Sequence, residues 1–182
     1  MLDICQRVGA KTVTKGKSMI TEEINLNDFL FEHAIEPVET DLGEYIIQLR
    51  GEHPSHIIAP AVHLNKEQVE EDFRRVHTHL DPKRDLTAPE TLLSEARQVL
   101  RKSYFQADVG ITGANFLIAE TGTSVIVTNE GNGDLTQSLP KVHIVVASIE
   151  KLVPTLEDCS QILRLLARSA TGQDISVYTT FS

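Results

Sequence analysis

The sequence is poor in cysteine, in aromatic residues and in positive charge. Its 182 residues include two cysteines, Cys5 and Cys159, and only 5% aromatic side chains. Two cysteines cannot build a disulfide framework or a four-thiolate metal site. Lysine and arginine number 17 against 26 acidic residues, which gives a formal net charge of −9. This acidic balance argues against general binding to nucleic acid or to an anionic membrane.

Segments that direct a chain into or across a membrane are also missing. No run of residues approaches the roughly 18 apolar residues that a membrane span needs. Residues 1–7 lack the basic-then-apolar order of a secretory signal. We therefore expect a cytoplasmic protein without a membrane span. The length fits a single domain over residues 1–182, since domains typically contain about 100–200 residues.

Several common catalytic motifs do not occur, namely GxGxxG, GxSxG, HExxH and CxxC. Their absence argues against a Rossmann dehydrogenase, a serine hydrolase, a zincin protease and a thiol-redox enzyme. The seven histidines show no metal-ligand spacing, so no metal site is predicted.

The order of apolar and polar segments predicts an α/β fold. Short β-prone runs alternate with amphipathic helices, which favours a mostly parallel sheet with flanking helices. The most apolar run, residues 142–147, predicts a central strand buried on both faces, and residues 55–60 predict a further strand. Capping residues predict helix starts at Asn65, Thr87 and Thr155.

A lysine-rich loop between a predicted strand and a predicted helix is the first candidate binding site. Lys15, Lys17 and Ser18 surround a glycine there. Two ammonium groups and a hydroxyl beside a helix N-terminus predict an anion cradle. A solvated loop is the alternative, because the Walker-loop spacing is absent. His63, which follows the predicted strand 55–60, is a further binding candidate.

Glycine-rich stretches at 110–115, 120–123 and 129–133 are the second candidate binding region. They leave backbone open to a ligand and carry side chains that both donate and accept hydrogen bonds. The last stretch follows a predicted strand, at the edge where α/β folds place ligands. The candidate binding residues are Thr112, Gly113, Asn115, Thr121, Gly122, Thr123, Asn129, Glu130, Gly131 and Asn132.

Glu120 is the candidate catalytic residue. It lies between the apolar segment 116–119 and the β-prone segment 125–127. A carboxylate in such a place is either hydrogen-bonded to the Thr-Gly-Thr backbone that follows it or a functional acid. The sequence leaves both interpretations open.

Six motifs, taken together and in order, resemble the LUD domain family. They cover residues 15–23, 39–49, 56–63, 107–115, 119–123 and 129–132, and so extend over nearly the whole chain. The resemblance implies the α/β fold shared by ribose-phosphate isomerase, glucosamine-phosphate deaminase, CoA transferases and formyltetrahydrofolate cyclo-ligase. Full-length members of this type resemble iron–sulfur subunits of L-lactate-oxidising complexes, with [4Fe–4S] clusters in a C-terminal ferredoxin-like region. This sequence has no such cysteine-rich region, so we expect a LUD core that binds no cluster itself.

The resemblance implies a role in the oxidation of L-lactate to pyruvate. The domain would hold an anionic substrate or cofactor, while clusters elsewhere in a complex with other lactate-utilization subunits carry out electron transfer. We expect the chain alone to be inactive, and a homo-oligomer is compatible with the sequence. One alternative is a stand-alone enzyme on a phosphate-ester, CoA or folate substrate that uses Glu120 or Glu130. A non-catalytic module that docks partner subunits is the other.

Overall fold

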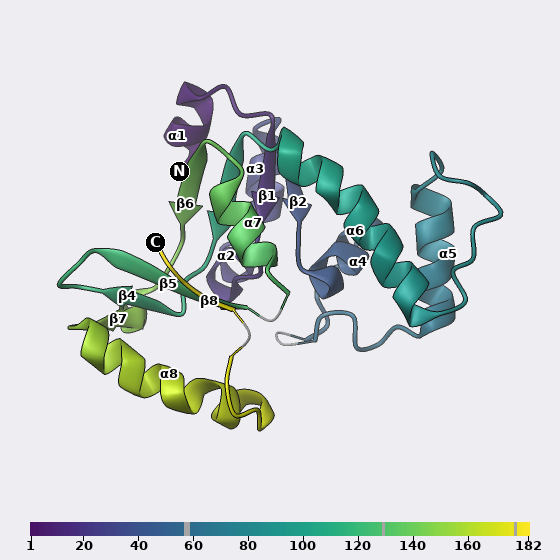
Figure 1. The fold of residues 1–182 in the computed structure, drawn as a ribbon. Helices are drawn as coiled ribbons and strands as arrows, with labels where there is room; N and C mark the ends of the chain where they lie inside the picture. The colour runs from purple at the N-terminus through teal and green to yellow at the C-terminus, as the bar shows by residue number, and fades with distance from the viewer. Residues whose placement is uncertain (57–58, 129, 177) are drawn as a thin grey trace.

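The computed structural model describes residues 1–56, 59–128, 130–176 and 178–182. Within these ranges the chain forms two β-sheets with helices packed around them (Figure 1). The elements in chain order are α1 (Leu2–Arg7), β1 (Thr12–Lys15), α2 (Met19–Glu23), α3 (Leu26–Glu32), β2 (Glu36–Glu39), α4 (Leu42–Arg50), α5 (Lys66–Val76), α6 (Pro89–Gln106), β3 (Val109–Thr112), β4 (Phe116–Ile118), β5 (Thr123–Thr128), α7 (Asn132–Ser138), β6 (Val142–Val145), the 3-10 helix η1 (Ile149–Lys151), β7 (Leu152–Val153), α8 (Leu156–Thr171) and β8 (Tyr178–Phe181).

The first sheet has the strand order β2-β1-β3-β6, and all its neighbouring strands are parallel. This confirms the predicted α/β fold with a parallel sheet. The prediction of a central strand at 142–147 is wrong, because β6 lies at the edge of the sheet and is only half-buried. The apolar character of this segment has another cause: Val142, Ile144 and Val146 pack against a hydrophobic cluster on one face of the sheet.

Helices cover both faces of the first sheet. On one face, Cys5 of α1 and Leu30 of α3 pack on Val13 and Val109. On the other face, α7 approaches β3 so closely that a Cβ added at Gly110 would lie 1.8 Å from the carbonyl oxygen of Thr136. Glycine is therefore required at position 110 for this layer to form.

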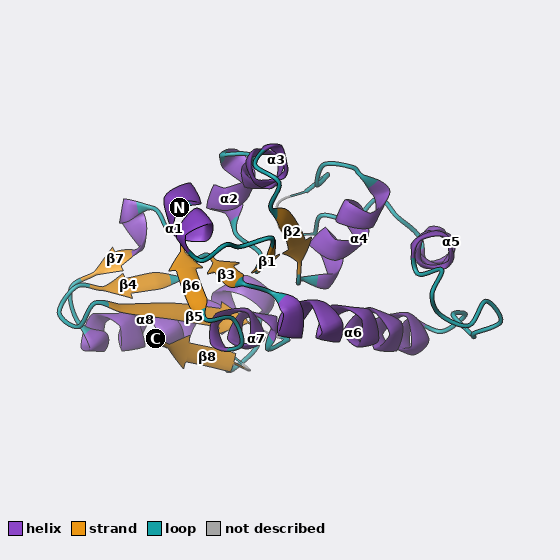
Figure 2. Cartoon of the chain, turned by 90° about the horizontal axis from the view of Figure 1, so that it is seen from above, coloured by secondary structure: helices purple, strands orange, loops and turns teal. Residues whose placement is uncertain are grey.

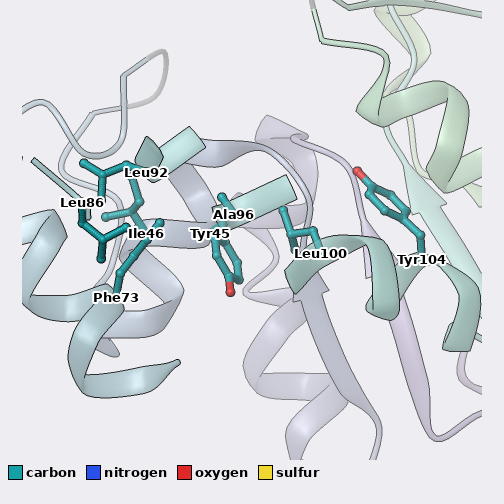
Figure 3. Packing of buried hydrophobic residues seen from close by; sticks show 8 residues of the cluster. All are labelled: Tyr45, Ile46, Phe73, Leu86, Leu92, Ala96, Leu100 and Tyr104. Atoms are coloured by element: carbon teal, nitrogen blue, oxygen red, sulfur yellow. The ribbon is translucent and has the colours of Figure 1, made fainter. Parts of the chain in front are cut away.

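Helices α4, α5 and α6 form a separate lobe beside the first sheet, and α5 lies far from both sheets (Figure 2). Its core contains the eight residues drawn in Figure 3. A buried polar chain holds the same helices together. The hydroxyl of Tyr45 lies 2.8 Å from Nε2 of His77, whose Nδ1 lies 2.8 Å from Glu95. Arg84 donates to both carboxylate oxygens of Glu95, so the chain ends on an ion pair.

The second sheet has the strand order β7-β4-β5-β8 and is mixed. Helix α8 runs along this sheet (Figure 2) and packs on it through Cys159 and Leu163. Three other apolar side chains of α8, those of Leu156, Ile162 and Leu165, are exposed.

Two of the predicted helix starts were confirmed. Asn65 caps α5 in a capping box with Gln68, and the hydroxyl of Thr155 accepts from the backbone of α8. The predicted start at Thr87 is wrong, because α6 begins with Pro89 and has Ala88 as its N-cap. The hydroxyl of Thr87 donates instead to Asp85, at 2.7 Å.

The predicted strand at 55–60 covers residues 57 and 58, which lie outside the described residues. Residues 55, 56, 59 and 60 are described, and these four belong to no strand.

Candidate functional site

A cleft of about 700 Å³ opens between the two sheets and is the candidate functional site. Its floor is formed by the segments that follow β1, β3 and β6, namely Gly16–Ile20, Gly113–Asn115 and Val146–Ser148. The strands are parallel, so their carboxyl ends meet at one edge of the sheet, which is where α/β folds bind ligands. Residues of strand β5 and of the C-terminal half of α8 form the opposite wall.

Donor groups from two loops gather on the floor of this cleft. Ser18 lies directly beside Gly113, where an added Cβ would be 3.0 Å from the Ser18 hydroxyl oxygen. Asn115 is held in place because its Oδ1 accepts from the backbone of Val127 at 2.8 Å. Its side-chain NH₂ adds a second donor to the hydroxyl of Ser18. The absence of a side chain at residue 113 thus lets the two loops come together.

Thr112 connects the floor to the edge strand. Its hydroxyl oxygen lies 2.8 Å from Nε2 of His143. Burial lowers the pKa of His143, so this imidazole is neutral at neutral pH. The cleft therefore gains no positive charge from His143.

Lys17 supplies positive charge at one end of the cleft. Its ammonium group lies 3.2 Å from the carboxylate of Glu44. Burial, together with the hydrogen bond and negative charge of Asp41, raises the pKa of Glu44 to about 8. Glu44 is therefore mostly protonated at neutral pH and adds little negative charge beside Lys17.

Glu130 lies exposed at the mouth of the same cleft. Partial desolvation and the negative charge of Asp41 raise its pKa, whereas Arg97 and Lys17 act in the opposite direction. The carboxyl group of Glu130 is therefore a weaker acid than that of an ordinary glutamate.

The structure brings together residues from three of the segments that the sequence singled out. The predicted residues that line the cleft are Lys17, Ser18, Thr112, Gly113, Asn115, Glu130 and Asn132. Those placed elsewhere are Lys15, His63, Glu120, Thr121, Gly122, Thr123 and Gly131. Asn129 lies outside the described residues.

Lys15 is fully buried and belongs to an ion-pair network. Its ammonium group lies 2.6 Å from Glu22 and 2.9 Å from Glu39. Burial opposes the charge, but the two carboxylates outweigh it and raise the pKa of Lys15. Side chains alternate along a strand, so Lys15 shares the face of Val13 and points away from the cleft. Its ammonium group is thus occupied by internal partners.

Glu120 lies on the turn between β4 and β5, and its Oε1 accepts from the backbone of Leu156 at 2.7 Å. The carboxylate therefore caps the first turn of α8 and is exposed to solvent. Thr121 donates to Thr123 within the same turn, in which Gly122 has a φ of +71°.

The two remaining residues outside the cleft also have local partners or roles. Nδ1 of His63 lies 2.8 Å from the hydroxyl of Ser55, and its Nε2 lies 3.1 Å from Glu52. Gly131 is the N-cap of α7, with a φ of +67°.

The sequence did not predict that α8 forms part of the wall of the cleft. Leu166, Ala167, Ala170 and Thr171 line the cleft from that helix. Small residues at 167 and 170 within a leucine-rich helix were the available signal, because they let a helix approach a ligand closely. Asp41 was also missed, since its sequence context is that of an ordinary helix cap.

The residues of this chain do not fit an iron–sulfur cluster. Such a cluster needs about four thiolates, whereas Cys5 and Cys159 are fully buried in two different hydrophobic clusters. Burial also raises the pKa of both thiols, which disfavours thiolate formation. Across the described parts of the chain, no three His, Cys, Asp or Glu side chains are grouped so that they could hold a metal ion. In those same ranges no helix is both long and apolar enough to cross a membrane.

Comparison with known proteins places the chain among bacterial relatives. Proteins named lactate utilization protein B are 47% identical in Bacillus velezensis, 46% in Bacillus subtilis and 48% in Lysinibacillus sphaericus, each over 179 residues and 98% of this chain. The aligned region is 36–37% of each relative, so the chain spans just over a third of their length. A crystal structure of a DUF162 family protein from Deinococcus radiodurans aligns over all of this chain with a TM-score of 0.36 and 16% identity.

The family model described as the LUD domain matches residues 4–182, which is nearly the whole sequence. The chain therefore belongs to the LUD domain family.

Proposed function

We propose that this chain serves lactate utilization as the domain that holds a small anionic substrate or cofactor in the cleft between its two sheets. The observation that carries the proposal is the convergence of Lys17, Ser18 and Asn115 at the carboxyl ends of parallel strands. These side chains offer an ammonium, a hydroxyl and an amide to a carboxylate or phosphate group. The names of the relatives support the lactate-utilization role.

The size of the cleft bears on the kind of ligand. Clefts of about 300–1,000 Å³ typically hold ligands of drug or cofactor size, and this one measures about 700 Å³. A three-carbon acid would fill a small part of it. We therefore propose that the anionic group belongs to an organic cofactor, or to lactate bound beside one. The apolar part of such a ligand would lie against Leu166 and Ala167 of α8.

In this proposal the oxidation of L-lactate to pyruvate takes place in a larger assembly with other lactate-utilization subunits. The electrons pass to [4Fe–4S] clusters outside this chain, because its two buried thiols do not fit a cluster. The domain's own contribution is binding and orientation, with Lys17 neutralising the anion and Asn115 fixing its position.

Titration of ligands against matched lysine variants tests the proposal. Phosphate, pyruvate, L-lactate and nucleotides would be titrated into the wild type, Lys17→Met and Lys11→Met by calorimetry. A charge-assisted contact contributes about 1.5–3 kcal/mol, so Lys17→Met should weaken binding by roughly 10- to 100-fold. Lys11 is exposed and does not line the cleft, so Lys11→Met should bind as the wild type does. Equal affinity in both variants, or no binding of any of these anions, would contradict the proposal.

A second candidate function follows from Glu130. Its raised pKa and its place at the mouth of the cleft suit a general acid or base in a stand-alone enzyme on a phosphate-ester, CoA or folate substrate. Turnover of such a substrate by the isolated chain, lost in Glu130→Gln, would favour this candidate. Binding of partner subunits without any small ligand would favour a docking module instead.

A further inference from the structure

A second, smaller cavity of about 180 Å³ lies on the far side of Lys15 from the cleft. Helices α2, α3 and α4 surround it. Five carboxyl groups line its wall, from Glu22, Asp28, Glu39, Glu44 and Glu52. Lys15, Lys17 and Arg50 pair with four of these groups and do not line the cavity. Glu44 is mostly protonated at neutral pH. The four other carboxyl groups outnumber the positive charges of Lys15 and Arg50, which leaves the cavity acidic.

Buried acceptors without donors distinguish this cavity from an ordinary acidic surface. Glu39 is 2% exposed and lines the cavity. Its Oε1 accepts from Lys15 and from Asn27, but its Oε2 finds no donor within the described part of the chain. Oδ1 of Asn27 is buried and lacks a donor in the same way. The NH₂ of Asn27 points to Glu39, so the orientation of this amide is fixed by its own hydrogen bond.

Oε2 of Glu39 and Oδ1 of Asn27 would both be satisfied by a ligand that donates hydrogen bonds, and the acidic wall favours a ligand with positive charge. A buried acceptor left without a donor is costly to the folded state. A divalent metal ion does not suit this wall, because in the described ranges no three acidic or imidazole side chains are grouped for metal coordination. A planar guanidinium presents five N–H donors over a wider area and can reach acceptors that one metal ion cannot.

We propose that the cavity bounded by Glu39, Asn27 and Glu22 is a recognition site for a guanidinium group. The group enters between α3 and α4 and donates to Oε2 of Glu39 and Oδ1 of Asn27. The surrounding carboxyl groups stabilise its charge. The site is separate from the cleft and does not depend on what the cleft binds.

The test titrates methylguanidinium into the full ¹⁵N-labelled chain and follows backbone amide resonances. We expect saturable shifts centred on residues 25–28 and 47–51. Tetramethylammonium carries the same charge without N–H donors and should bind at least about tenfold more weakly. Absence of saturable binding, or equal binding of both cations, would overturn the proposal.

Variants locate the site. Glu39→Gln should weaken methylguanidinium binding at least about tenfold, whereas Glu36→Gln, an exposed carboxylate on the same strand, should leave it unchanged. Because Glu39 also pairs with Lys15, Glu39→Gln can fail to fold. Asn27→Leu then tests the same site without removing a charge from Lys15, and it should also weaken binding. Wild-type affinity in a folded Asn27→Leu or Glu39→Gln would overturn the assignment.

A final comparison identifies the source of the group. Acetyl-arginine amide presents the guanidinium as a protein side chain does. Binding comparable to methylguanidinium supports recognition of an arginine on a partner protein. Binding of methylguanidinium alone supports a small free ligand in the same site.

Discussion

Residues 15–20 lie beside both the cleft and the acidic cavity, yet the two are lined by different types of side chain. Gly16–Ile20 contributes to the cleft, where Ser18 lies beside Gly113 and Asn115 adds an amide. Lys15 stands behind the acidic cavity, where Glu22 and Glu39 surround its ammonium. Two lysines that are two positions apart thus differ in burial, because Lys15 is the last residue of β1 and is fully buried, whereas Lys17 lies in the loop that follows. The comparison shows that a basic residue near a strand end is not in itself an anion ligand, because its place in the strand or in the loop after it decides what it meets.

The largest expected effect comes from removing the buried lysine. Lys15→Met leaves Glu22 and Glu39 without their shared cation. Breaking a buried pair in this way costs about 3–5 kcal/mol. Lys17→Met should cost at most about 1 kcal/mol, since a partly exposed ion pair contributes little. Urea denaturation of both variants measures the difference, and equal stabilities would remove the distinction between the two lysines.

Variants of two glycines separate an effect on protein stability from an effect on ligand binding in the cleft. Gly110→Ala should destabilise the protein by about 3 kcal/mol, because the new methyl group would overlap the backbone of α7. Gly113→Ala meets the hydroxyl oxygen of Ser18 at 3.0 Å and its Cβ at 3.1 Å, and a small shift of Ser18 relieves both contacts, so its stability should fall by about 1 kcal/mol. Its affinity for an anion in the cleft should nevertheless drop about tenfold. Thermal melts and ligand titrations on both variants check this pair, and the reverse pattern would place the site elsewhere.

Glu120 lies on the β4–β5 turn of the second sheet, and Glu130 lies at the cleft. Variants of these two residues therefore compare the two regions. Glu120→Gln should cost at most about 1 kcal/mol, because glutamine can still accept from Leu156. It should leave anion affinity unchanged. Glu130→Gln removes negative charge from the mouth of the cleft and should raise anion affinity about two- to fivefold.

Calorimetric titration separates these outcomes. A loss of about 100-fold in turnover in Glu120→Gln, or a covalent adduct on Glu120, would support the enzyme alternative and make this residue catalytic.

A further expected effect is a pH dependence of stability. The pKa of Glu44 is raised to about 8 in the folded chain, above an unfolded value of about 4.3. Between these values the unfolded chain binds fewer protons, so stability falls as pH rises. Glu44→Gln stays neutral, so its Tm relative to the wild type should increase from about pH 5 to about pH 8.5. A constant difference in Tm over this range would show that Glu44 is ionised throughout.

The sequence alone determined the class of fold and the family. Alternating β-prone and amphipathic segments predicted a parallel sheet, and local signals such as Asn65 with Gln68 placed helix starts correctly. Segments 15–18, 110–115 and 129–133 each contribute residues to the cleft. The sequence could single them out because glycine and short polar side chains at strand ends are local properties of a sequence.

Only the tertiary structure decided which members of those segments meet. Lys15 ends β1 and is fully buried, whereas Lys17 lies in the loop that follows. Glu120 turns to the start of α8 because the β4–β5 turn passes beside it. The wall from α8 and the cavity around Glu39 join segments far apart in the chain. Periodicity reports which side of an element is apolar, but not which other element will cover it. The position of each polar side chain within the site is therefore set by packing between elements.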